Sequence, residues 1–151
     1  MHTAGVNTRS TWRQTPRQSI EAKCARRGKD AVVAGCIALL EGREADAELI
    51  VALGGPPAYW AVSGERGGPP YWLRVWAARG LLWAWDDKAL PSVLSALGDD
   101  AWRVREMAAK VVARHRLGDA LPIVADLRQD PTQRVRLAAS RAVVHLTGTG
   151  A

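Results

Sequence analysis

Apolar residues recur at intervals of three and four along the second half of the chain, from Tyr71 onward. This spacing places them on one face of an α-helix, whereas a half-buried strand would show strict alternation. The pattern predicts helices at about Tyr71–Trp85, Lys88–Leu97, Ala101–Arg116, Ala120–Arg128 and 131–146. Short and long helices alternate, and no segment shows a convincing strand pattern.

Aspartates precede the later predicted helices, as N-terminal caps do. We expect the caps to be Asp87, Asp100, Asp119 and Asp130. A proline falls in the first turn of each short helix, where its missing N–H breaks no hydrogen bond, and Asp130-Pro131 is a strong start signal. The pairs Asp86-Asp87 and Asp99-Asp100 are therefore interpreted as caps and not as paired catalytic carboxylates.

The first half of the chain is less regular. Residues 1–28 hold few apolar side chains, which predicts a disordered basic tail. A transit peptide and a start codon assigned too early are alternative readings of the same composition. Helices are expected through Ala31–Leu40 and over Asp46–Leu53, so that residues 29–57 form an N-terminal helical cap.

A sequence pattern repeats every 31 residues. Leu73–Arg79 returns as Val104–Lys110 and again as Val135–Arg141. A fixed period of this length is typical of stacked helical hairpins, each of which buries its apolar face against the next. We therefore predict an all-α fold, a short α-solenoid behind the helical cap. Its three repeats span about 58–88, 89–119 and 120–150, within 58–151.

The repeated residues resemble those of HEAT repeats, particularly the short bacterial kind once named after phycobilisome lyases. The resemblance rests on Pro91, Asp99 and Val104-Arg105, which return as Pro122, Asp130 and Val135-Arg136. The first repeat is degenerate, because Trp60 stands where proline is expected and Gly68 where aspartate is expected. The resemblance implies that Asp99, Arg105, Asp130 and Arg136 form a structural hydrogen-bonded ladder.

Charge is unevenly distributed over the chain, whose net charge is +6. Residues 1–29 carry seven basic residues and one acid, residues 30–70 carry a net −4, and residues 71–151 a net +4. A mildly basic repeat region attracts either an acidic protein or nucleic acid. Two cysteines build no disulfide framework, which favours a cytoplasmic location, and Ala31–Leu40 is too short to span a membrane.

Catalytic patterns are scarce in the sequence. The three histidines have no partner at metal-ligand spacing, so no metal, no cofactor and no enzymatic activity are predicted. His115 shares a helix face with Val104 and Ala108, and is interpreted as a core or capping residue. Five of the seven tryptophans lie between Trp60 and Trp85. Packing is favoured for Trp76 among them, and exposure for Trp83 and Trp85.

One surface pattern exceeds what stacking requires. Arg103, Lys110 and Arg114 lie within about 20° of one another around their helix. Equivalent positions one period away complete a ridge, and the predicted partner-binding residues are Trp72, Arg79, Trp83, Arg103, Lys110, Arg114, Arg134 and Arg141, beside His145. A solvated flank of basic side chains is the plainer reading of this ridge.

These patterns together predict a non-catalytic scaffold that mediates protein–protein interaction, with an acidic protein partner on the ridge. The alternative is nucleic-acid binding, in which tryptophans stack on bases and arginines meet phosphates. By resemblance, that alternative extends to HEAT-like glycosylases that remove alkylated bases from DNA. A pigment lyase rests on the historical repeat name alone. The oligomeric state stays open, with Ala142, Val143 and Val144 as either a dimer surface or a cap.

Overall fold

The computed structural model describes residues 14–55, 58 and 71–148, and every regular element in these ranges is a helix. Three α-helices form the front of the molecule, namely α2 (Pro16–Arg27), α3 (Lys29–Leu40) and α4 (Ala47–Gly54). Long helices follow as α6 (Tyr71–Trp83), α8 (Trp102–His115) and α10 (Gln133–Thr147). Between them lie the short elements η3 (Asp87–Ala89), α7 (Leu90–Ala96), η4 (Gly118–Ala120), α9 (Leu121–Asp126) and η5 (Leu127–Gln129).

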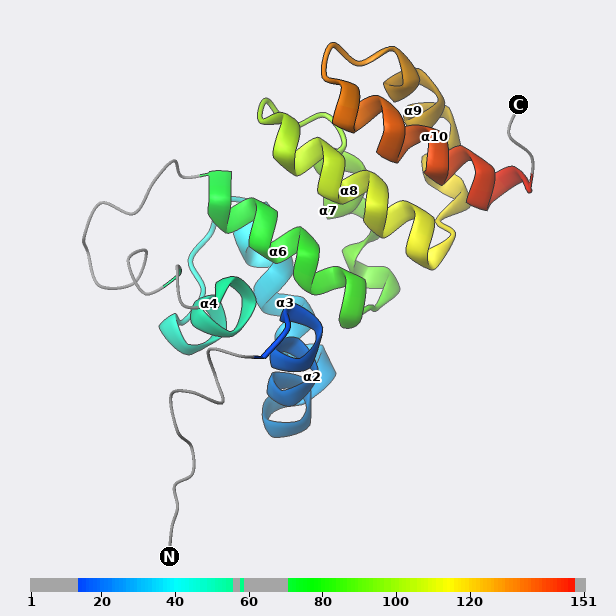
Figure 1. Cartoon of the computed structure of the whole chain (residues 1–151). Helices are drawn as coiled ribbons and strands as arrows, with labels where there is room; N and C mark the ends of the chain where they lie inside the picture. Colours follow the sequence, from blue (N-terminus) through cyan, green and yellow to red (C-terminus); the bar gives the residue numbers. More distant parts are fainter. Residues whose placement is uncertain (1–13, 56–57, 59–70, 149–151) are drawn as a thin grey trace, which may run out of the picture.

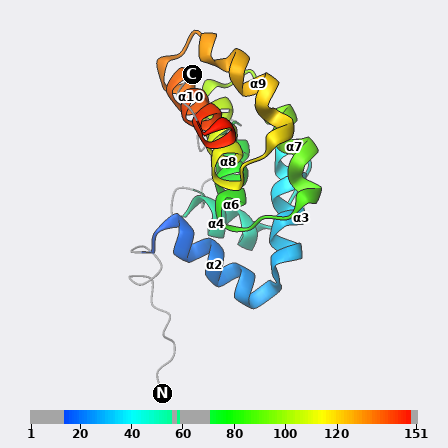
Figure 2. The same ribbon diagram turned by 90° about the vertical axis from the view of Figure 1, so that its right-hand side faces the viewer.

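The long helices stack side by side, with α8 packed between α6 and α10 (Figure 1). The turned view in Figure 2 shows a second layer, in which α3, α7 and α9 follow one another. This arrangement confirms the predicted all-α solenoid. No helix in residues 14–55 or 71–148 has the length and apolarity that a bilayer crossing needs.

Small and branched apolar residues from both layers build one continuous core. Val104, Val111 and Val135 are fully buried, as are Ala77, Ala108 and Ala139 at equivalent positions of the three long helices. An alanine at this position lets neighbouring helices approach closely. The 31-residue spacing of the apolar positions therefore reflects successive helices that meet their neighbours in the same register.

The N-terminal caps differ in detail from the expected ones. Asp86 accepts a hydrogen bond from the Lys88 N–H (2.9 Å), and Asp99 accepts one from the Ala101 N–H (2.8 Å). Asp87 was therefore wrong as a cap by one residue, because the N-cap of η3 is Asp86. Asp100 was also wrong, because the N-cap of α8 is Ala101, and Asp99 binds the N–H of this residue in the turn before the helix.

Helix α10 also begins later than expected. Its N-cap is Thr132, and the Asp130 carboxylate accepts from the Thr132 N–H at 2.9 Å. Pro131 lies in the turn before the helix and not at its first position. The predicted helix over Ala120–Arg128 is divided into η4, α9 and η5. Short 3₁₀ turns of this kind commonly connect and end α-helices.

The predicted disordered tail was wrong for residues 16–27, which form α2. A capping box between Thr15 and Gln18 starts this helix, and Ile20 is fully buried. The Ser19 hydroxyl donates to the Ala52 carbonyl in α4 at 2.7 Å. One isoleucine, good capping and cross-helix polar contacts therefore order a segment whose composition is poor in apolar residues. Residues 1–13 lie outside the described residues.

Glycines allow the front helices to pack closely on α6. A Cβ atom on Gly80 would lie 2.6 Å from Leu53 Cδ2 in α4 and 2.8 Å from Cys36 Sγ in α3. A Cβ on Gly54 would lie 2.7 Å from the Trp76 ring. Burial raises the pKa of the Cys36 thiol to about 12, which fits its place in this core. The three helices at the front are thus fixed against the first long helix.

Candidate functional site

A ladder of ion pairs joins successive repeats at the N-terminal ends of the long helices. Arg74 holds Asp99 through Nε (2.7 Å) and Nη2 (3.1 Å). Arg105 holds Asp130 in the same way, at 2.8 and 3.2 Å. Each arginine therefore binds the aspartate of the following repeat through two parallel hydrogen bonds, the geometry that a guanidinium and a carboxylate favour.

The ladder arginines also bind their own repeat. Nη1 of Arg105 donates to the carbonyls of Asp99 (2.8 Å) and Asp100 (3.1 Å). Nη1 of Arg136 donates to the carbonyls of Asp130 (2.8 Å) and Pro131 (3.1 Å). These contacts agree with a structural role for the four predicted ladder residues. Arg74 was missed as the first rung, although the 31-residue period places it in register with Arg105.

A second set of contacts joins repeats at the other ends of the long helices. The Arg114 Nε donates to the Leu82 carbonyl at 2.8 Å, and the His115 Nε2 lies 2.7 Å from the Leu81 carbonyl. The His115 ring stacks on Trp85 with centroids 4.7 Å apart. Burial, opposed by the carbonyl contact but aided by the Arg114 charge, lowers the pKa of His115. His115 is thus the capping residue that was expected, placed at the C-terminal end of the neighbouring α6.

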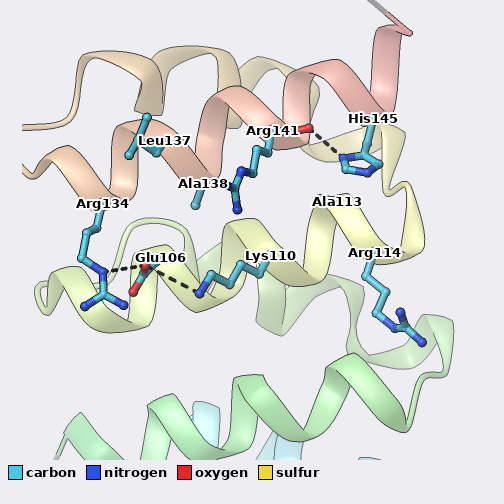
Figure 3. A pocket seen from close by; sticks show the side chains of 9 residues that line it. All are labelled: Glu106, Lys110, Ala113, Arg114, Arg134, Leu137, Ala138, Arg141 and His145. Atoms are coloured by element: carbon cyan, nitrogen blue, oxygen red, sulfur yellow. Dashed lines mark hydrogen bonds and ion pairs between the residues drawn. The ribbon is translucent and has the colours of Figure 1, made fainter.

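A basic groove of about 420 Å³ lies between α8 and α10 (Figure 3). Its lining residues are Glu106, Lys110, Ala113, Arg114, Arg134, Leu137, Ala138, Arg141 and His145. Four basic side chains and a single carboxylate thus line the groove. Apolar side chains from α10 form part of the wall, so the groove offers both charge and contact area to a ligand.

Glu106 organises the charges within this groove. It is 7% exposed and pairs with Arg134 Nε at 3.0 Å and with Lys110 Nζ at 3.6 Å. In Figure 3 both cationic side chains converge on it, one from each helix. The Arg141 side chain also points into the groove, and its guanidinium makes no hydrogen bond or ion pair among residues 14–55 and 71–148, whereas its carbonyl contacts His145 Nδ1 at 2.9 Å. One carboxylate therefore fixes two cations and leaves a third free for a ligand.

Cation–π contacts align the start of the ridge. The Arg103 guanidinium lies 5.5 Å from the Trp72 ring centroid and 4.4 Å from that of Trp102. The Arg134 guanidinium lies 5.2 Å from the same Trp102 ring. Cations and aromatic rings thus alternate across three repeats, which stabilises the side chains in one arrangement. Trp102 was missed because its role depends on arginines from two different helices.

A profile of HEAT repeats matches residues 65–143, which is slightly more than half of the chain. The chain belongs to the HEAT-repeat family. Members of this family generally mediate protein–protein interaction and are typically non-catalytic scaffolds. No curated protein and no solved structure matches the chain. The likeness to the short bacterial kind of HEAT repeat stays a prediction.

The HEAT-repeat ridge contains most, but not all, of the predicted binding residues. Arg79 is directed into the interface with α4, where its Nη2 donates to the Leu53 carbonyl at 2.7 Å. Its Nε is buried without a hydrogen-bond partner, and burial lowers the pKa of its guanidinium. The placement of Arg79 on an accessible ridge was therefore wrong. The period along the sequence carries no information about α4, which covers this copy of the ridge.

Trp72 and Trp83 of the first long helix are half-buried, whereas Trp76 is buried. Trp83 is flanked by the guanidinium groups of Arg114 (4.3 Å) and Arg17 (5.0 Å). Trp72 stacks on Trp76 with centroids 6.3 Å apart, and Trp76 is 9% exposed, as its predicted packing role requires. The expected exposure of Trp83 and Trp85 holds only in part. The groove between α8 and α10 is consequently the best candidate site. The described residues contain no cluster of three side chains that could hold a metal ion.

We predict that the two aspartates of the HEAT-repeat ladder make the stability of the fold depend on pH below about 4. Burial acts to raise the pKa of Asp130, but the Arg105 hydrogen bond, the Thr132 N–H and the nearby positive charges outweigh it, so the pKa is lowered. The same balance lowers the pKa of Asp99. A lowered folded-state pKa stabilises the protein above the unfolded value of about 4, and this stability is lost as pH falls through the folded pKa.

Urea titrations at pH values from 7 to 2 measure this loss as a falling unfolding midpoint. An Asp99→Asn/Asp130→Asn variant should start from a lower midpoint at pH 7 and show a flatter decline below about pH 4, because two linked carboxylates are gone. Parallel declines in the two proteins would show that other acids dominate.

Proposed function

We propose that this HEAT-repeat chain is a non-catalytic adaptor that binds an acidic segment of a partner protein in the groove between α8 and α10. The observation that carries the proposal is the groove's charge: Lys110, Arg134 and Arg141 face a space in which Glu106 supplies the only carboxylate of the lining. Arg141 is exposed and uncommitted. Complementary charge of this kind favours both the encounter with an acidic segment and its orientation.

Preorganised geometry supports the same proposal. Arg134 and Lys110 are held by the buried Glu106, so they lose little freedom when a ligand binds. The exposed Leu137 lies beside them on α10 and offers apolar contact. A peptide with acidic and apolar side chains therefore fits the groove better than a purely ionic ligand.

Aromatic stacking argues for a protein rather than a nucleic-acid partner. A base needs a free aromatic face, and stacking on such faces supplies much of the affinity for single strands. Here Trp102 and Trp83 each have two guanidinium groups over their rings, from Arg103 and Arg134 and from Arg114 and Arg17. These contacts would have to be broken before a base could stack.

The proposal is tested by fluorescence anisotropy with a labelled peptide of alternating glutamate and leucine-containing blocks, and with its glutamine counterpart. The full chain should bind the glutamate peptide at least tenfold more tightly than the glutamine peptide at about 0.1 M salt. Arg141→Glu combined with Lys110→Gln should weaken the glutamate complex about tenfold or more. Glu106 remains intact in this variant, so the buried carboxylate keeps Arg134 as its partner.

The matched control is Arg26→Glu combined with Lys88→Gln. It changes the net charge by the same amount at exposed positions outside the groove, and should leave affinity within about twofold. An equal loss of affinity for the glutamate peptide in both double variants would show that only the overall charge matters, and would overturn the proposal. Tighter binding of a DNA duplex or single strand, abolished by the groove variant alone, would assign the groove to nucleic acid instead.

A further inference from the structure

The outer face of α10 repeats a face that is covered elsewhere in the molecule. Gln133, Leu137, Ser140 and Val144 stand one period after Trp102, Glu106, Ala109 and Ala113. On α8, Glu106 and Ala109 are buried in the region where α10 packs. On α10, Leu137 is 55% exposed and Val144 is 41% exposed, whereas Ala142 and Val143 are buried. Of the three residues considered for a dimer surface, only Val144 therefore faces outward.

Arg136 is poised on the edge of this face. Its Nη1 makes the same two carbonyl contacts as Nη1 of Arg105, at the same distances of 2.8 and 3.1 Å. Arg105 uses its remaining edge, Nε and Nη2, to bind the carboxylate of the next repeat. Among residues 14–55 and 71–148, no carboxylate meets the corresponding edge of Arg136. The guanidinium is thus oriented before any anion arrives.

We infer that the outer face of α10 binds a helix of a partner protein that is preceded by an aspartate. The carboxylate would bind Nε and Nη2 of Arg136, and the helix would cover Leu137 and Val144. The two internal rungs define the spacing, because Asp99 and Asp130 each stand three residues before the first residue of their helix. This inference shares Leu137 with the groove, but Arg136 and Val144 are not among the groove's lining residues, and the inference does not rest on the proposed function.

Charge decides between a partner and a second copy of this chain. Helix α10 carries Arg134, Arg136 and Arg141 and no acidic residue. Two such faces would repel each other across a twofold axis, where equivalent residues meet. An aspartate just before a helix, in contrast, brings a negative charge that the helix N-terminus also stabilises. The face therefore complements a helix with an acidic start and not its own copy.

The test uses, with the full chain, a labelled peptide of residues 118–148 in which Arg134, Arg136 and Arg141 are replaced by glutamine, so that it keeps Asp130 before the helix without the basic side chains of a second copy. This segment carries Asp130 and α10, the helix that already packs on α8. The peptide should bind saturably, and its Asp130→Asn form should bind about tenfold more weakly, as expected for loss of a charge-assisted hydrogen-bonded pair. With an Arg136→Gln chain, the two peptides should bind equally. A chain with Arg128→Gln, an exposed arginine on η5, serves as the matched control.

A second probe guards against a peptide that fails to become helical. It is the same peptide stapled between positions 140 and 144, on the side that should face away from the chain. Absence of saturable binding by both peptides would overturn the inference. Unchanged affinity of the peptide for the Arg136→Gln chain would also overturn the inference. The peptide would then bind without Arg136, by displacing the chain's own last hairpin from α8. Self-association of the chain that Leu137→Glu abolishes would assign the face to a second copy, and would equally overturn it.

Discussion

Replacing Asp130 with alanine will lower the free energy of unfolding by about 3–5 kcal/mol. The Asp130 side chain is 4% exposed and the Arg105 side chain 16% exposed, so water screens their ion pair poorly. Alanine would leave the Arg105 guanidinium without its carboxylate and would also remove the acceptor for the Thr132 N–H. A single change therefore breaks the ion pair between repeats and the turn before α10. Urea unfolding followed by circular dichroism measures the difference.

The control for this prediction is Asp126→Ala. Asp126 is exposed on α9, where the change should alter stability by less than about 0.5 kcal/mol. Similar losses in both variants would mean that negative charge in general stabilises this basic region, and that the Asp130 pair has no special weight.

Gly80→Ala will destabilise the fold by about 1–3 kcal/mol, although alanine is the better helix former by about 1 kcal/mol. The new Cβ would lie 2.6 Å from Leu53 Cδ2 and 2.8 Å from Cys36 Sγ. Both side chains are buried between helices and have little room to move. Steric overlap therefore outweighs the gain in helix propensity. Differential scanning calorimetry should show a lower melting temperature.

Gly98→Ala is the matched comparison for Gly80. A Cβ there would meet its nearest atom, the Ser95 carbonyl oxygen, at 3.7 Å, and Gly98 does not have a positive φ. Its stability should stay within about 0.5 kcal/mol of the unchanged protein or rise slightly. If Gly80→Ala behaved in the same way, the junction between α6 and the front helices would be looser than described.

The repeat architecture could be predicted from the sequence because one physical requirement recurs in every copy. Each long helix packs an aliphatic residue and an alanine against its neighbours, and carries an arginine next to that aliphatic residue that binds a turn of the solenoid. These residues therefore return every 31 positions, as at Val104 and Val135. The basic ridge was predicted for the same reason, since Lys110 and Arg141 occupy equivalent positions on stacked helices, whereas the groove between α8 and α10 was not predicted.

Features that occur once could not be found in this way. Helix α2 depends on a single buried isoleucine and a capping box, which average composition conceals. Arg79 is half-buried because α4 packs over it, a contact between segments that share no repeat. The place of Glu106 between two cations depends on the distance between α8 and α10. Periodicity identifies positions that are equivalent in every repeat, so it gives no signal for contacts that occur in one repeat alone.

The one-repeat offset of the ladder gives the solenoid a polarity. Each of Arg74 and Arg105 binds the aspartate of the following repeat. The ladder therefore ends with the guanidinium of Arg136 after the last repeat, and would need a carboxylate before the first. The position in the first repeat that corresponds to Asp99 and Asp130 is Gly68, which has no side chain to ionise. Copies of the chain joined head to tail would therefore lack the ion pair at this position in every junction. The ladder therefore adds no ion pair to a contact of this kind, from which open filaments would form.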